Sequence, residues 1–127
     1  MTYNHVVVWI DHVDAHVIHF NRDAQDNEKI TTHSTRPHLH VKSGTLGSGR
    51  APENTHYFND IAEAISDSQE ILVVGPGFEK LVFMKYLLKH HPVVAEKVLS
   101  VETVDHPTDN QLVAFAKKYF LREDQMR

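Results

Sequence analysis

The sequence contains no cysteine among its 127 residues. Disulfide bonds and metal sites built on thiolates are therefore excluded, and the composition suits a reducing compartment. Long apolar runs are also absent, since no segment approaches the roughly 20 residues that a membrane span requires. Residues 1–5 lack the basic and apolar regions of a secretory signal peptide. We therefore expect a cytoplasmic protein with no membrane partner.

Glycine and proline are scarce, with five of each. Three of the glycines and two of the prolines fall in residues 36–54, which show neither helical nor strand periodicity. A loop of this length inside a small domain is usually either functional or disordered. Its basic side chains are Arg36, His38, His40, Lys42 and Arg50. The sequence therefore predicts a basic, glycine-rich loop at this position.

Acidic side chains outnumber basic ones in the chain as a whole, and the net charge is -4 with histidine neutral. A globally acidic chain is poorly suited to bind nucleic acid over its whole surface, and we expect no DNA partner. The 11 histidines gain charge as the pH falls. Solvated surface histidines are the simplest interpretation of that number.

Apolar runs predict three strands in the first third of the chain. The unbroken run at 6–10 predicts a strand buried on both faces, and 15–20 predicts a second strand joined to it by a hairpin. The polar stretch 21–27 predicts a turn. Residues 29–35, rich in threonine and isoleucine, predict a third strand near the edge of the sheet.

Helices and strands alternate after the loop. A helix is predicted from Thr55, a buried strand at 71–74, and a second helix between Gly77 and Pro92. In this second helix an apolar arc should be well covered by the rest of the domain. The arc consists of Leu81, Val82, Met84, Leu87 and Leu88. A basic face of Lys80, Lys85, Lys89, His90 and His91 should be solvated.

The chain continues with a predicted strand at 98–104 and a final helix. Thr108 and Gln111 have the spacing of a capping box at the start of that helix. Its apolar stripe is predicted as Leu112, Phe115, Ala116, Tyr119 and Phe120. The order β-β-β-α-β-α-β-α predicts a single α/β domain over 1–127 with a mixed sheet, an outline that ribonuclease-H-like folds share.

The segment 71–80 reads Ile-Leu-Val-Val-Gly-Pro-Gly-Phe-Glu-Lys and is followed by Tyr86-Leu87. It resembles the strand-to-helix signature of the central domain of the Pelota and eukaryotic-type release factor family. The helix led by Tyr57-Phe58 resembles the aromatic helix that precedes this signature in the family. The likeness covers most of residues 4–104. Small stand-alone bacterial domains, known as translational machinery proteins, are similar.

The resemblance implies a non-catalytic protein of translation, of the rescue or hibernation type, whose partner is the ribosome or a tRNA. In the Pelota central domain the matching loop is basic and meets RNA. By that likeness Arg36, His38, His40, Lys42 and Arg50 would contact RNA. Release factors of the family hydrolyse peptidyl-tRNA with a Gly-Gly-Gln loop, which residues 43–50 lack. The resemblance therefore implies neither catalytic residues nor a cofactor here.

Two other functions stay open on the residues alone. Asp11 follows the first strand, where nucleases of the ribonuclease-H type hold a metal ion, and Asp60, Glu63 or Asp105 could supply further carboxylates. That set is incomplete, because the strand at 71–74 ends without an acid. The acidic net charge favours a second alternative, a protein-interaction adaptor without an RNA role, such as a homo-oligomer.

Histidine pairs suggest metal ligands at two places. His38 and His40 have alternate spacing, and His12, Asp14 and His16 form a second set. A metal site needs three or four ligands, and nothing in the sequence brings a complete set together. We therefore predict no metal site.

Overall fold

The computed structural model describes residues 4–21, 24–31 and 55–126, with side chains described as far as Phe120. Five strands form one mixed sheet in the order β3-β2-β1-β4-β5. The strands are β1 (His5–Ile10), β2 (Asp14–Phe20), β3 (Gln25–Thr31), β4 (Glu70–Gly75) and β5 (Val98–Thr103). The helices are α2 (Thr55–Ile65), α3 (Glu79–His90), α4 (Pro92–Ala95) and α5 (Asp109–Met126). The predicted α/β class and element order are confirmed, with the one-turn helix α4 added.

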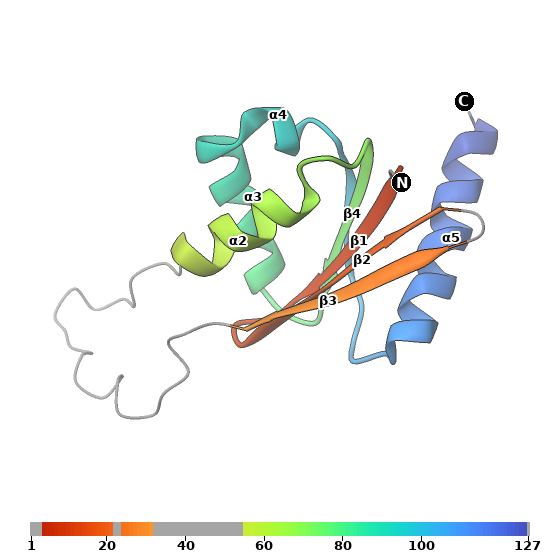
Figure 1. The fold of residues 1–127 in the computed structure, drawn as a ribbon, viewed down its shortest axis with the longest axis horizontal. Coiled ribbons are helices and arrows are strands. Elements are labelled where there is room, and N and C mark those ends of the chain that lie inside the picture. Colours follow the sequence, from red (N-terminus) through yellow and green to blue (C-terminus); the bar gives the residue numbers. More distant parts are fainter. Residues whose placement is uncertain (1–3, 22–23, 32–54, 127) are drawn as a thin grey trace, which may run out of the picture.

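The sheet is covered by helices on both faces (Figure 1). Strands β1, β2 and β3 are antiparallel neighbours, whereas β4 and β5 run parallel to β1. Successive side chains of a strand point to opposite faces. Val6, Val8 and Ile10 therefore pack under α2, α3 and α4, while Val7 and Trp9 pack under α5. This double coverage explains why β1 is apolar at nearly every position.

The third strand lies earlier in the chain than the sequence predicts. Asn21, directly after β2, donates its N–H to the carbonyl of Ala24, directly before β3, at 3.0 Å. Residues 25–27, expected in the turn, pair with β2 instead. Most of β3 is exposed at the sheet edge, so its polar side chains gave no apolar signal of a strand. Residues 32–35 lie outside the described part of the chain.

The orientation of α3 also differs from the prediction. Leu81 and Leu88 are exposed, at 47% and 62%, whereas Lys80 is 6% exposed. The buried face consists of Lys80, Phe83, Tyr86 and Leu87. Nζ of Lys80 donates a hydrogen bond to the carbonyl of Gly77, which satisfies the buried amine. The expected basic face is therefore interrupted at its first residue, and the expected apolar arc is only partly covered.

The capping box that begins α5 is confirmed. Gln111 N–H donates to Oγ1 of Thr108 at 3.1 Å, and Thr108 N–H donates to Oε1 of Gln111 at 2.9 Å. Leu112, Ala116 and Phe120 are buried as expected. Phe115 is 38% exposed, and Val113 takes its place against the sheet. No helix in the described ranges is long and apolar enough to span a bilayer.

Candidate functional site

The predicted RNA-binding residues lie outside the described part of the chain. They are Arg36, His38, His40, Lys42 and Arg50. The two described residues that flank this segment are Thr31, the last of β3, and Thr55, the first of α2. Their positions show at which end of the sheet the segment begins and returns.

That end is the carboxyl edge, which we define as the end of the sheet where Ile10, Thr31, Gly75 and Thr103 lie. Thr31 pairs with Asp14, directly after the turn that follows β1. The start of α2 reaches the same turn, because the hydroxyl of Tyr57 donates to the carbonyl of Asp11 at 2.9 Å. Ligands of α/β folds generally bind at the carboxyl ends of parallel strands.

A cleft of about 500 Å³ opens at the carboxyl edge, and we call it the edge cleft. Three turns line it: Asp11 and His12 after β1, residues 76–79 after β4, and His106 after β5. Its volume is within the range typical of small-molecule sites. The parallel arrangement of β1, β4 and β5 thus brings together three segments that are far apart in the sequence.

Asp11 fixes the first wall of the edge cleft. Its Oδ1 accepts the N–H groups of Val13 and Asp14, each at 2.8 Å. Two such bonds hold the carboxylate in one orientation and close the turn into β2. The interpretation of Asp11 as a hairpin-turn residue is therefore confirmed, and Asp11 also lines the cleft.

The turn after β4 forms the second wall. A Cβ atom at Gly75 would lie 2.3 Å from the carbonyl oxygen of Ile10, so only glycine lets β4 end this close to β1. Phe78 follows with a side chain that is 79% exposed. Its carbonyl accepts the N–H groups of Leu81 and Val82 at 2.8 and 3.1 Å. The ring is thus open to solvent, while the backbone that carries it is part of a helix start.

Burial changes the proton affinity of two groups beside the cleft. Burial raises the pKa of Glu79, the nearby His12 lowers it, and the negative charge of Asp11 raises it. Burial also raises the pKa of the Tyr57 hydroxyl far above its usual range, with a further contribution from Asp11. The folded chain therefore favours protonated Glu79 more than the unfolded chain does. The stability that this difference contributes is lost as the pH rises through the raised pKa of Glu79.

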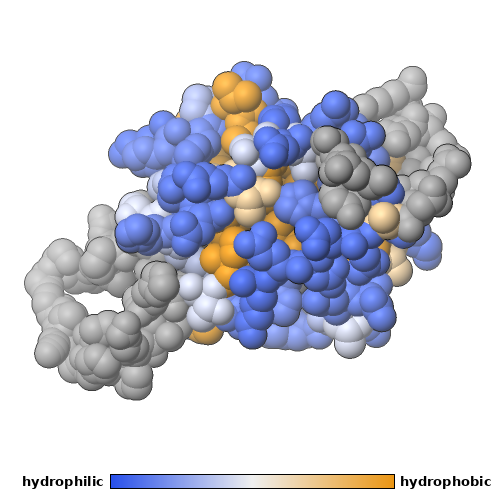
Figure 2. Space-filling view, in the orientation of Figure 1, coloured by the Kyte–Doolittle hydropathy of each residue, from blue (hydrophilic) through white to orange (hydrophobic). Residues whose placement is uncertain are grey.

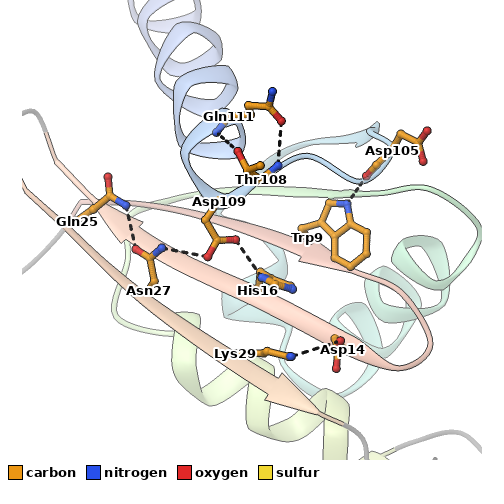
Figure 3. A network of polar contacts seen from close by, with 10 residues as sticks. All are labelled: Trp9, Asp14, His16, Gln25, Asn27, Lys29, Asp105, Thr108, Asp109 and Gln111. Atoms are coloured by element: carbon orange, nitrogen blue, oxygen red, sulfur yellow. Dashed lines mark hydrogen bonds and ion pairs between the residues drawn. The ribbon is translucent and has the colours of Figure 1, made fainter.

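A polar network anchors α5 beside this edge (Figure 3). Oδ1 of Asp109 lies 3.0 Å from Nδ1 of His16 on β2, and Oδ2 accepts from Asn27 on β3 at 3.2 Å. Nε1 of Trp9 donates to the carbonyl of Asp105 at 2.6 Å. These contacts join the first turn of α5, and the segment before it, to three strands of the sheet.

A small cavity of about 70 Å³ lies within this network, lined by Trp9, His16, His106 and others. Its size suits water rather than an organic ligand. The ring of His106 lies 5.1 Å from that of Trp9 and lines both this cavity and the edge cleft. Trp9 itself is 6% exposed, which confirms it as a core residue rather than a stacking surface.

The carboxylates considered for a nuclease do not gather at one place. Asp60 and Glu63 are exposed on α2 and do not line the edge cleft, and Asp105 pairs with His106 at 2.9 Å. Within residues 4–21, 24–31 and 55–120, no three histidine or acidic side chains are arranged to hold a metal ion. Of the second histidine set, Asp14 accepts from Thr31 and His16 contacts Asp109.

The face shown in Figure 2 is mainly hydrophilic, with hydrophobic residues visible in a strip down its middle. The largest exposed apolar side chains among the described residues include Phe78, Leu81, Leu88 and Val93. All four belong to α3, α4 or the turn that precedes α3. Apolar side chains on this side of the domain are therefore only partly covered.

Sequence reasoning missed the edge cleft as a unit. It singled out Asp11 and His12 for metal chemistry, and it did not consider Phe78, Glu79 or His106 as site residues. A signal was present, because all of them lie within a few residues of the end of a predicted strand. The distances between those strands in space were not readable from the sequence.

The mixed sheet and its helices define an α/β domain with a cleft at the carboxyl edge of the sheet. No family model matches the sequence. A Pelota homologue of the archaeon Methanococcus aeolicus is 42% identical over 55 residues, which are 42% of this chain and 16% of that protein. The chain thus spans less than a fifth of the length of this relative.

Solved structures extend the likeness over nearly the whole chain. Archaeoglobus fulgidus Pelota shares the fold with a TM-score of 0.62 at 16% identity, over 93% of this chain and 32% of that one. An archaeal translation termination factor gives 0.56 at 11% identity, over 83% and 31%. Dom34 of Saccharomyces cerevisiae gives 0.56 at 10% identity, over 95% and 38%. The chain therefore shares the fold of Pelota and release-factor structures, and it is similar in sequence to a Pelota homologue over 55 residues.

Proposed function

We propose that this chain acts in translation as a non-catalytic protein that binds the ribosome or a tRNA, in ribosome rescue or hibernation. The family likeness carries the proposal. Among the relatives that share the fold, one is a translation termination factor, and Dom34 is a termination-like factor involved in RNA quality control. The proposed location is the cytoplasm, where such particles are found.

The basic loop is the proposed RNA contact. Arg36, Lys42 and Arg50 would meet phosphates, and His38 and His40 would add charge as the pH falls. The position of Thr31 and Thr55 supports this, since both flank the segment at the carboxyl edge. Phosphate contacts from a glycine-rich segment would give affinity without sequence readout.

Charge reversal tests the loop directly. The double variant Lys42→Glu and Arg50→Glu should bind single-stranded RNA more weakly, with a salt slope reduced by ~0.7 for each phosphate that is no longer neutralised. Fluorescence anisotropy at several salt concentrations measures both. The matched control is Lys117→Glu with Lys118→Glu, an equal charge change at exposed positions of α5. Equal weakening by both pairs would show that only net charge matters.

A protein-interaction adaptor remains the second candidate, and one observation favours it. Leu81, Leu88 and Val93 are 47%, 62% and 68% exposed, and they belong to α3 and α4, two helices that contact each other. Exposed apolar side chains that gather on one side are typical of a protein-binding surface. On this account, binding of the partner would be insensitive to salt and to the charge of the loop.

A further inference from the structure

Two carboxyl groups, those of Asp11 and Glu79, line the edge cleft. Oδ1 of Asp11 accepts two backbone N–H groups, which orient the carboxylate. Among the described residues, none donates to Oδ2 of Asp11 or to the carboxylate of Glu79. Ionised carboxylates only accept hydrogen bonds. A ligand that complements these two groups must therefore bring donors.

An exposed aromatic ring lies on the same cleft. Phe78 lines it with 79% of its side chain exposed, while its carbonyl is held by the first turn of α3. Gly77, the residue before Phe78, is held in place by the hydrogen bond that Lys80 donates to its carbonyl. A ring that is open to solvent on a fixed backbone offers a stacking face to a flat ligand.

Two simpler occupants fit the cleft poorly. A phosphate group would face the carboxylates of Asp11 and Glu79, which repel it. A metal ion needs at least three suitable ligands, and the described side chains supply no such group. A flat ligand with hydrogen-bond donors meets both demands of the cleft.

Nucleobases are flat, and they differ in the donors of their Watson–Crick edge. Guanine presents N1–H and the N2 amino group side by side, so its edge offers two adjacent donors to carboxylate oxygens that line the cleft. In adenine and cytosine the amino group adjoins a ring nitrogen that accepts. In uracil the single N3–H lies between two carbonyl acceptors. Unstacked RNA bases are typically read through this edge while stacked on an aromatic side chain.

We propose that the edge cleft binds one unstacked guanine base, stacked on Phe78 and hydrogen-bonded through N1–H and N2 to the carboxylates of Asp11 and Glu79. This inference rests on the proposed function, because RNA would supply the base. It adds a base-specific contact to the phosphate contacts of the loop. His12 and His106 line the remaining wall and face the same ligand.

Dinucleoside monophosphates test the cleft apart from the ribosome. The ¹⁵N-labelled full chain is titrated with GpU, ApU, CpU and UpU, which share one phosphate and differ in one base. GpU should shift the amide signals of Gly77, Phe78, Glu79 and His106, and it should bind about tenfold more tightly than UpU. Equal affinity for all four, or shifts confined to other regions, would overturn the proposal.

Variants identify the contacts. Phe78→Ala should weaken GpU binding about tenfold, whereas Leu88→Ala, which removes a side chain that is 62% exposed on the same helix, should not. Asp11→Asn keeps the acceptor of the turn, and Glu79→Gln keeps the size of the side chain. Each should reduce the preference for GpU over UpU. Retention of that preference in both variants would contradict the assignment.

A guanidinium group is the competing ligand, because it is also flat and rich in donors. N-acetylarginine amide is therefore titrated in parallel, and tighter binding than GpU at the same amides would make the cleft a protein-binding site. The loop variant Lys42→Glu, Arg50→Glu should keep the preference for GpU. Ribosome binding without base preference would overturn only the proposal that the edge cleft binds guanine. Base preference without ribosome binding would overturn the proposed function alone.

Discussion

Gly75 shows how a single residue shapes the carboxyl edge. A Cβ atom there would lie 2.3 Å from the carbonyl oxygen of Ile10, and both residues are buried within the sheet. The obstacle is backbone and cannot move aside as a flexible side chain can. The same residue begins the turn that carries Phe78 and Glu79. Packing of β4 on β1 and the form of the cleft therefore depend on one missing methyl group.

Replacement of Gly75 by alanine should lower the free energy of unfolding by about 1–3 kcal/mol, because the sheet must shift to accept the methyl group. Gly77 provides the matched control, since nothing lies within 4 Å of a Cβ placed there. Gly77→Ala should change stability by no more than about 0.5 kcal/mol. Urea denaturation measures both, and equal effects would contradict the account of Gly75.

Lys80 marks the limit of residue-level prediction. A lysine on a helix is normally assigned to solvent, because its amine is costly to bury. Here the carbonyl of Gly77, three residues earlier, provides an acceptor within reach. That acceptor exists only because the Gly75-Pro76-Gly77 turn has a particular shape. Composition and periodicity do not encode it.

At the scale of elements, α5 is the one helix among the described residues that packs on its face of the sheet. Its buried residues Leu112, Val113, Ala116 and Phe120 contact Val7, Trp9 and their neighbours. Its start is fixed by the Thr108 capping box and by Asp109, which contacts His16 and Asn27. Helix, turn and two strands are thus joined at one point, beside the small cavity.

Thr108→Ala should destabilise the domain by about 0.5–2 kcal/mol, because the N–H of Gln111 loses its acceptor at the helix start. Thr108→Ser keeps the hydroxyl group and should retain most of the stability. Thermal unfolding followed by circular dichroism measures the difference. Comparable destabilisation in the two variants would show that the methyl group, and not the cap, matters.

The sequence predicts most elements because burial leaves a pattern. Strands β1 and β4 are apolar on both faces, and α2 and α5 carry regular stripes, so their positions agree with the prediction. The position of β3 was predicted too late in the chain, because this strand is largely exposed and polar and leaves no apolar pattern. Its pairing with β2 defines its bounds. The buried face of α3 was predicted wrongly, because apolar side chains occur on both sides of the helix. Its orientation is therefore determined by tertiary packing.

At the scale of the molecule, the site depends on topology. Residues 11–12, 76–79 and 106 meet only because β1, β4 and β5 are parallel neighbours. Sequence reasoning identified these strands but not which of them are adjacent, and so the cleft was not predicted. The predicted loop contacts at residues 36–50 lie outside the described residues and remain a prediction.

The two proposed contacts would act at one edge of the domain. Thr31 and Thr55 lead to the basic loop there, and the edge cleft opens beside Tyr57 and Asp11. An unpaired segment of RNA would supply both the phosphates for the loop and the base for the cleft. The chain corresponds in fold to about a third of a Pelota protein, and the proposal assigns RNA binding to this part.

Co-sedimentation with ribosomes tests the central claim most directly. Tagged protein is run on sucrose gradients with extracts of growing and starved cells, at low and moderate salt, beside the Lys42→Glu, Arg50→Glu variant and the Lys117→Glu, Lys118→Glu control. We predict that the unaltered protein and the control migrate with a ribosomal particle at low salt, while the loop variant stays near the top. Protein that remains at the top in every condition would contradict a role on the ribosome.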